Sequence, residues 1–168
     1  MKLKLLKGDI TKLYVDAIVN SANTSLMGGE GVDAAIRAAA GPELLDECRR
    51  LHGCRAGEAK ITNGYDLAAD YVIHTVGPIW RGGVVGEKTL LISCYQNCME
   101  LAKQHHIKSI VFPLISAGIY GYPKREAITV AITTLKQYED TDIEISLILY
   151  NSDTYMLANR ILAQLNKK

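Results

Sequence analysis

Residues 16–36 read DAIVNSANTSLMGGEGVDAAI, and this stretch joins the two kinds of element that the rest of the chain repeats. Its apolar run at 17–19 ends at an asparagine and is typical of a short buried strand. Beyond the glycines, Ala35, Ile36 and Ala39 recur at the spacing of one helical face. The stretch therefore predicts a strand, a polar glycine-rich loop and a helix, in that order.

Strands and helices alternate along the whole chain. Runs rich in β-branched and apolar residues predict strands, whereas apolar residues three and four positions apart predict helices. The expected strands are 3–5, 17–20, 60–62, 71–76, 110–112 and 143–150, and the expected helices are 35–39, 44–51, 91–102, 127–135 and a last one, capped by Ser152 or Asp153, that carries Leu157, Ile161 and Leu165. Because crossovers between parallel strands place helices on both faces of a sheet, this order predicts an α/β fold, a three-layer α/β/α sandwich with a central mixed β-sheet.

Length and charge narrow the class of protein. At 168 residues the chain has the size of one domain, so we expect a single domain over residues 1–168. It carries 19 Lys and Arg against 18 Asp and Glu, and this balance argues against binding nucleic acid by bulk electrostatics. The opening MKLKLLKGD interrupts its apolar residues with charges, unlike a signal peptide, and no apolar run approaches a membrane span. We therefore expect a cytoplasmic monomer with no membrane partner.

Four cysteines in an intracellular chain are expected to be reduced. Cys94 and Cys98 lie four positions apart in a helical pattern, and we expect both to face the core. Cys48, His52 and Cys54 form a cluster of possible zinc ligands, but three candidates without a fourth fall short of a closed structural site. We expect no metal.

Two loops that follow predicted strands are suited to bind phosphate. Gly28-Gly29-Glu30-Gly31 precedes a helix, whose free N–H groups and dipole attract anions. Residues 116–123, SAGIYGYP, also lead from a strand into a helix and offer a second set of backbone donors. Two such loops favour a diphosphate ligand. A glycine-rich turn without a ligand is the alternative that either motif alone leaves open.

Three other phosphate-binding or catalytic motifs match the sequence only in part. Residues 29–34 fit the loose dinucleotide pattern G-x-G-x-x-A, but the residues from 20 to 27 separate them from the preceding strand. Residues 86–89, GEKT, lack the adjacent Gly-Lys of a P-loop, and Ser116 has Leu114 where a nucleophile elbow needs glycine. The sequence supports neither a nucleotide triphosphatase nor a serine hydrolase.

Five motifs in order resemble those of a known family. They are GDIT at 8–11, DAIVNSAN at 16–23, LMGGEGVDAAI at 26–36, GEAKIT at 57–62 and SAGIYGYP at 116–123. The series is similar to that of the macrodomains, specifically the MacroD-type branch, and spans nearly the whole chain. The resemblance implies a pocket for ADP-ribose or O-acetyl-ADP-ribose, with mono-ADP-ribosylated proteins as partners and no dissociable cofactor.

The resemblance also implies roles for individual residues. Asp9 would accept a hydrogen bond from the adenine amino group, although an aspartate that only caps its own turn is the alternative. Tyr150 would stack on adenine, although a tyrosine in the core or at the sheet edge is equally compatible with the sequence. The backbones of the two loops would hold the diphosphate and the terminal ribose. The substrate-binding residues expected in this way are Asp9, Ile10, Asn20, Asn23, Gly31, Val32, Asp33, Ser116, Ala117, Gly118, Ile119, Tyr120 and Tyr150.

Asn23 and Asp33 are the expected catalytic residues. In the MacroD-type branch the asparagine contacts the terminal ribose, and the aspartate is thought to orient or activate a water, with help from the substrate itself. An ester to Asp or Glu releases a carboxylate, which leaves without strong acid assistance, so one base and good positioning can suffice. Asp33 falls in the first turn of a predicted helix, where the dipole favours the charged form. The alternative is an aspartate that only stabilises the helix start.

Three positions depart from the branch pattern and keep two functions open. Glu30 stands where the third of four glycines is common, Arg37 where histidine is common, and Ala34 where glycine is frequent. Like charge at Glu30 could repel a diphosphate, or the side chain could point to solvent and change little. The first hypothesis is a hydrolase of mono-ADP-ribose esters and O-acetyl-ADP-ribose, and the second is a reader that binds ADP-ribose without turnover. Binding of single-stranded RNA or poly-ADP-ribose is disfavoured, because the charge is neutral and no basic, aromatic-studded strand is present.

Overall fold

The computed structural model describes residues 2–167 and contains one six-stranded sheet. The order across the sheet is β1-β6-β5-β2-β4-β3, and every neighbouring pair is parallel except β3 with β4. The sheet is therefore mixed, as the sequence predicts. The strands are β1 (Lys4–Lys7), β2 (Ala17–Ser21), β3 (Ala59–Asn63), β4 (Tyr71–Thr75), β5 (Ser109–Phe112) and β6 (Glu144–Leu149).

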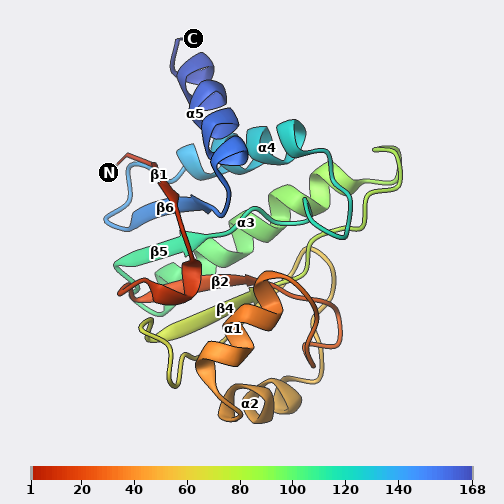
Figure 1. Cartoon of the computed structure of the whole chain (residues 1–168), viewed down its shortest axis with the longest axis vertical. Helices are drawn as coiled ribbons and strands as arrows, with labels where there is room; N and C mark the ends of the chain where they lie inside the picture. Colours follow the sequence, from red (N-terminus) through yellow and green to blue (C-terminus); the bar gives the residue numbers. More distant parts are fainter. Residues whose placement is uncertain (1, 168) are drawn as a thin grey trace.

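Helices cover both faces of this sheet (Figure 1). They are the 3₁₀ turn η1 (Ile10–Lys12) and the α-helices α1 (Val32–Ala40), α2 (Glu43–Leu51), α3 (Glu87–Gln104), α4 (Lys124–Lys136) and α5 (Ser152–Asn166). The predicted α/β/α sandwich is confirmed. One cap was predicted wrongly, because Asn151 and not Ser152 or Asp153 caps α5, accepting a hydrogen bond from Thr154 N (2.8 Å).

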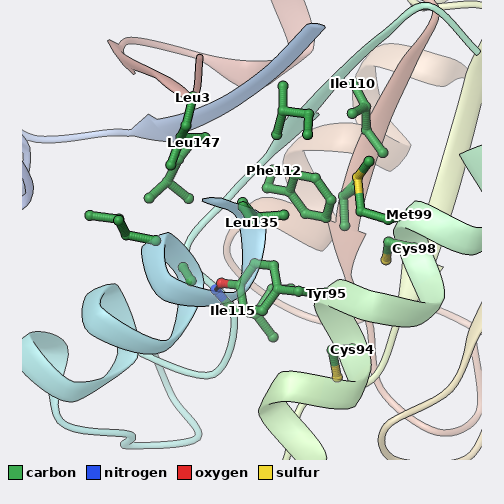
Figure 2. Packing of buried hydrophobic residues seen from close by; sticks show 14 of the residues in the cluster. Leu3, Cys94, Tyr95, Cys98, Met99, Ile110, Phe112, Ile115, Leu135 and Leu147 are labelled. Atoms are coloured by element: carbon green, nitrogen blue, oxygen red, sulfur yellow. Dashed lines mark hydrogen bonds between the residues drawn. The ribbon is translucent and has the colours of Figure 1, made fainter. Parts of the chain in front are cut away.

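Alternate strand side chains supply two separate apolar layers. Ala17 and Val19 pack with α3, α4 and α5, whereas Ile18 packs with α1 and α2. In the first layer the rings of Tyr95 and Phe112 lie 5.4 Å apart between centroids (Figure 2). Burial on both faces explains why the central strands are continuous apolar runs.

The cysteines lie in these apolar layers. Cys94 and Cys98 lie on the buried face of α3, toward the core, as predicted (Figure 2), and Cys48 and Cys54 are buried in the other layer. Burial raises the pKa of the Cys54 thiol to about 11. Over residues 2–167 no three His, Cys, Asp or Glu side chains gather in a way that could hold a metal ion. None of the helices in that range combines the length and apolar character that a membrane crossing requires.

The parallel strands all point the same way, so their carboxyl ends share one edge of the sheet. The segments that leave β1, β2, β5 and β6 at this edge begin with Gly8, Ala22, Pro113 and Tyr150. Ligands of such sheets bind outside the carboxyl ends of the strands. The topology therefore brings together the loops that the sequence analysis singled out.

A buried carboxylate fixes the loop between β4 and α3. Glu87 Oε2 accepts hydrogen bonds from the backbone N–H groups of Arg81 (2.9 Å) and Gly83 (2.8 Å), and Oε1 accepts one from Val85 (2.8 Å). Burial alone would raise the pKa of Glu87, but the backbone donors outweigh it and lower the pKa from 4.5 to about 2. The loop is thus held in one conformation by a charged group at the start of α3.

We predict that Glu87 contributes stability in a pH-dependent manner. Since its pKa in the folded protein lies below its unfolded value, the contribution is complete above about pH 4.5 and is lost as the pH falls toward 2. Urea denaturation should give a lower free energy of unfolding for Glu87→Gln than for the parent at pH 6, and a smaller difference in that free energy at pH 3. A gap that does not change with pH would contradict this assignment.

Candidate functional site

A cavity of about 730 Å³ lies at the carboxyl edge of the sheet. Its volume is in the range typical of small-ligand sites. All of the expected substrate-binding residues except Asn20 line it. These are Asp9, Ile10, Asn23, Gly31, Val32, Asp33, Ser116, Ala117, Gly118, Ile119, Tyr120 and Tyr150.

Asp9 lies on the wall near the end of β1. Its Oδ1 accepts hydrogen bonds from Thr11 N (2.9 Å) and Thr11 Oγ1 (2.7 Å), so the turn-capping alternative is present in the structure. These bonds, the one from the Thr11 side chain foremost, lower the pKa of Asp9. Its Oδ2 accepts no hydrogen bond within residues 2–167, and it remains available to a ligand.

Tyr150 follows β6 at the same end of the cavity. Its side chain is 82% exposed, which excludes the alternative of a core tyrosine. An exposed ring at a cavity wall has a free face on which a planar ligand can stack.

The start of α1 provides the first set of backbone donors. Gly31 precedes the helix with φ 62° and makes no side-chain cap. The N–H of Ala35 bonds to Gly31 O (3.1 Å), whereas those of residues 32–34 have no acceptor in the described chain. Glu30, by contrast, does not adopt a positive φ, so the backbone does not require glycine there. Its side chain is exposed and lines the cavity.

The loop between β5 and α4 provides the second set. Its ends are tied by bonds from Tyr122 N to Ser116 O (2.9 Å) and from Gly121 N to Gly118 O (3.0 Å). The N–H groups of residues 117–120 donate to no acceptor within residues 2–167. Ser116 has φ 67°, which is uncommon outside glycine, and its hydroxyl donates to Pro78 O (2.8 Å). The cavity thus has two loops with free donors, as the sequence predicts.

Asn23 and Asp33 lie close together beside Gly29. A Cβ atom added to Gly29 would lie 3.4 Å from both Asn23 Nδ2 and Asp33 Oδ2. Asn23 also orders its own loop, since Nδ2 donates to Gly28 O (2.7 Å) and Oδ1 accepts from Leu26 N (3.2 Å).

Asp33 is only 2% exposed, and its charge has two partners. Oδ1 accepts a hydrogen bond from Asn20 Nδ2 (2.6 Å), and Oδ2 forms an ion pair with Arg37 Nε (3.0 Å). A buried carboxylate needs such partners, because its desolvation is otherwise too costly. The Asp33 carboxylate is therefore held in one orientation at the cavity wall.

Asn20 lies behind the wall and does not line the cavity. Its amide donates to Asp33 and also to His74 Nδ1 (3.1 Å), while His74 Nε2 lies 2.9 Å from Thr62 Oγ1. Burial, and then the nearby Arg37 charge, lower the pKa of His74 to about 3. Neutral His74 therefore accepts at Nδ1 and donates from Nε2. Asn20 supports Asp33, which differs from the direct contact with substrate expected for it.

Arg37 links the cavity wall at Asp33 to the neighbouring loop. Besides its ion pair with Asp33, its Nη2 donates to Leu26 O (2.8 Å), and Leu26 has φ 59°. From the sequence, Arg37 is only a departure from the family pattern. The i,i+4 spacing of Asp33 and Arg37 on one helix was the signal that could have predicted their pairing.

Two further residues at or near the site, Lys124 and His74, were not predicted from the sequence. Lys124, at the first position of α4, lines the cavity and adds a cation to it. His74 sits in the middle of β4, and a histidine inside a run of β-branched residues was the available signal for a buried polar network.

Comparisons with known proteins identify the family. The model of the Macro domain family matches residues 19–131. A macro domain-containing protein of Chlorobaculum tepidum is 62% identical over 132 residues, covering 79% of this chain and 77% of that protein. The human ADP-ribose glycohydrolase MACROD2 is 56% identical over 138 residues, covering 82% of this chain and 32% of that protein. A mutant of the Oceanobacillus iheyensis macrodomain with ADPR has a TM-score of 0.95 at 41% identity, covering 99% of this chain and 94% of that one.

Family model, sequence relatives and solved structure agree with one another. The matched segment runs from β2 into α4 and contains both of the loops that carry free backbone donors. The resemblance drawn from the five sequence motifs is confirmed. This chain belongs to the macrodomain family.

Proposed function

We propose that this protein binds ADP-ribose and hydrolyses its esters, either mono-ADP-ribose on acidic side chains of proteins or O-acetyl-ADP-ribose. The observation that carries the proposal is the proximity of Asn23 and Asp33 on a cavity wall beside two sets of free backbone N–H groups. Relatives support it, because MACROD2 is named an ADP-ribose glycohydrolase and the O. iheyensis macrodomain was solved with ADPR. The proposed chemistry uses water as the nucleophile and no metal or dissociable cofactor.

In the proposed complex the ligand spans the cavity from the ends of β1 and β6 to the start of α1. Asp9 would accept a hydrogen bond from the adenine amino group through its free Oδ2, and Tyr150 would stack on the base. The N–H groups of residues 32–34 and 117–120 would hold the diphosphate. The terminal ribose would then lie beside Asn23 and Asp33.

Asp33 would position the attacking water. Each carboxylate oxygen accepts one hydrogen bond from the protein and keeps a lone pair for another donor. For an ester that joins a protein carboxylate to the anomeric carbon of the terminal ribose, the water oxygen forms a bond to that carbon, and the bond from that carbon to the ester oxygen breaks. The acyl group leaves as a carboxylate, and the water proton passes to Asp33 or to an oxygen of the substrate itself. Good positioning with one base is enough for such a leaving group.

A reader module that binds ADP-ribose without turnover is the second candidate. Glu30 brings negative charge to the cavity wall at the proposed diphosphate site. Arg37 pairs with the carboxylate that turnover requires. These two features act on the diphosphate and on the reacting end of the ligand, whereas Asp9 and Tyr150 lie on other loops and leave adenosine recognition intact.

Asp33→Asn separates the two candidates. The substitution keeps the size of the side chain and an oxygen that can accept from Asn20 or Arg37, so we expect the fold to persist. For a hydrolase, release of ADP-ribose from a protein modified on glutamate should fall by about 10²-fold or more, while calorimetry should give a Kd for ADP-ribose within about threefold of the parent. If the parent binds ADP-ribose but releases none from the modified protein, the reader is correct.

Removal of the negative charge at Glu30 should increase the affinity for ADP-ribose. We expect Glu30→Gln to tighten ADP-ribose binding by about twofold to fivefold at low salt, because an exposed like charge beside a diphosphate contributes up to about 1 kcal/mol. The gain should shrink as salt screens it. Glu43→Gln is the matched control, since Glu43 is also exposed but does not line the cavity. Equal effects of the two substitutions would mean that Glu30 points away from the ligand.

Arg37 is predicted to hold Asp33 in its working position. Arg37→Met leaves a buried carboxylate without its ion pair, so urea denaturation should show that the free energy of unfolding falls by about 3 kcal/mol. If the parent turns over, kcat should fall while the Kd for ADP-ribose stays within about threefold, because Arg37 does not line the cavity. Arg37→Lys, which keeps the charge, should recover part of both losses. Unchanged stability in Arg37→Met would show that the ion pair does not support Asp33.

A further inference from the structure

A second hollow adjoins the first cavity at the end where the reacting bond would lie. It has a volume of about 310 Å³, and Tyr120 lines both spaces. Thr24, on the wall of the hollow, directly follows Asn23, on the wall of the cavity. Asp9 and Tyr150 border only the first cavity. The hollow is therefore next to the proposed site of the terminal ribose and away from the adenine end.

The loop that forms one wall of the hollow is rigidly held. Glu87 accepts three backbone hydrogen bonds from it. Trp80 N donates to Tyr120 O (2.8 Å), which ties the loop to the wall shared with the first cavity. The Trp80 ring packs on that of Tyr122, with centroids 4.7 Å apart. Its surface is thus in place before any partner binds, which lowers the entropy cost of docking.

The exposed groups on this wall are apolar residues and one cation. Ile79 and Val85 are exposed where they line the hollow, and Val85 is 59% exposed. Arg81 also lines it, is exposed, and forms no ion pair with any residue from 2 to 167. The Glu87 carboxylate is buried and already accepts three backbone hydrogen bonds. Arg81 is therefore the charge that a ligand in the hollow meets.

We propose that this hollow binds the polypeptide segment that carries the ADP-ribosylated acidic residue, and that Arg81 pairs with a second carboxylate next to the modified one. The proposal rests on the proposed function, because it takes the terminal ribose to lie at Asn23 and Asp33. The ester joins that ribose to a protein, so the polypeptide has to continue into space beside this end of the cavity. The hollow is such a space, and an apolar rim with an unpaired cation suits an acidic segment in extended form.

The test compares a peptide with a free nucleotide. In the Asp33→Asn background, which prevents turnover, calorimetry would measure the Kd of ADP-ribose and of a ten-residue peptide that is mono-ADP-ribosylated on one glutamate flanked by aspartates. We expect the peptide to bind about fivefold more tightly than ADP-ribose, and Arg81→Glu to abolish that advantage while the Kd of ADP-ribose changes by less than about twofold. Arg160→Glu makes the same charge change on an exposed residue of α5 that lines neither space, and it should have no effect.

A second pair of variants tests the apolar rim. Val85→Ser should weaken the peptide about twofold to threefold and leave ADP-ribose unchanged, whereas Val84→Ser should change neither, because Val84 is 84% exposed but does not line the hollow. Equal affinities of peptide and ADP-ribose, or equal weakening of both by Arg81→Glu, would overturn the peptide subsite and leave the proposed function standing. Absence of any ADP-ribose binding would overturn the proposed function and the subsite together.

Discussion

The carboxylate of Asp33 links the cavity wall to the rest of the fold. It is buried, and a buried charge persists only with partners of good geometry. Arg37 supplies one partner and Asn20 the other, and Asn20 in turn rests on His74 in the neighbouring strand. Helix α1, strand β2 and strand β4 are therefore joined through one side chain. Because several elements fix it, Asp33 meets a ligand in an orientation that the ligand does not have to create.

The rest of the cavity wall relies on backbone more than on side chains. The first turn of α1 and residues 117–120 keep free N–H groups, and the adjacent backbone has a positive φ at Gly31, which glycine readily adopts, and at Ser116, where it is uncommon. Such strain persists where the surroundings enforce it, here through the Ser116 hydroxyl bond to Pro78. The space for that serine depends on Gly77, since a Cβ there would lie 2.0 Å from Ser116 Oγ. Backbone donors do not depend on the side chain beside them, which explains how a glutamate is accommodated at position 30.

Local patterns were sufficient for the secondary structure and for the two donor loops. The strand at 17–20 and the helix at 127–135 both follow from the period of their apolar residues, and parallel strands bring the loops after β2 and β5 to one edge. Contacts between helices and strands could not be predicted from the sequence. Strand periodicity does not say that Asn20 faces Asp33, because that depends on how α1 crosses the sheet. The cap of α5 was missed by one residue, since asparagine, serine and aspartate are all good caps and only geometry selects Asn151.

The arrangement around Asp33 connects the two functions that remain open for this chain. The ion pair with Arg37 and the hydrogen bond from Asn20 hold the carboxylate in one orientation, so its part in the proposed reaction is to position a water. An ester whose leaving group is itself a carboxylate needs little acid or base assistance, since positioning of the water contributes much of the rate. A substrate with a poorer leaving group would require stronger acid or base assistance than this wall supplies. Under the proposed function, the geometry of Asp33 and Arg37 therefore suits ester linkages to acidic groups better than more resistant bonds to ADP-ribose.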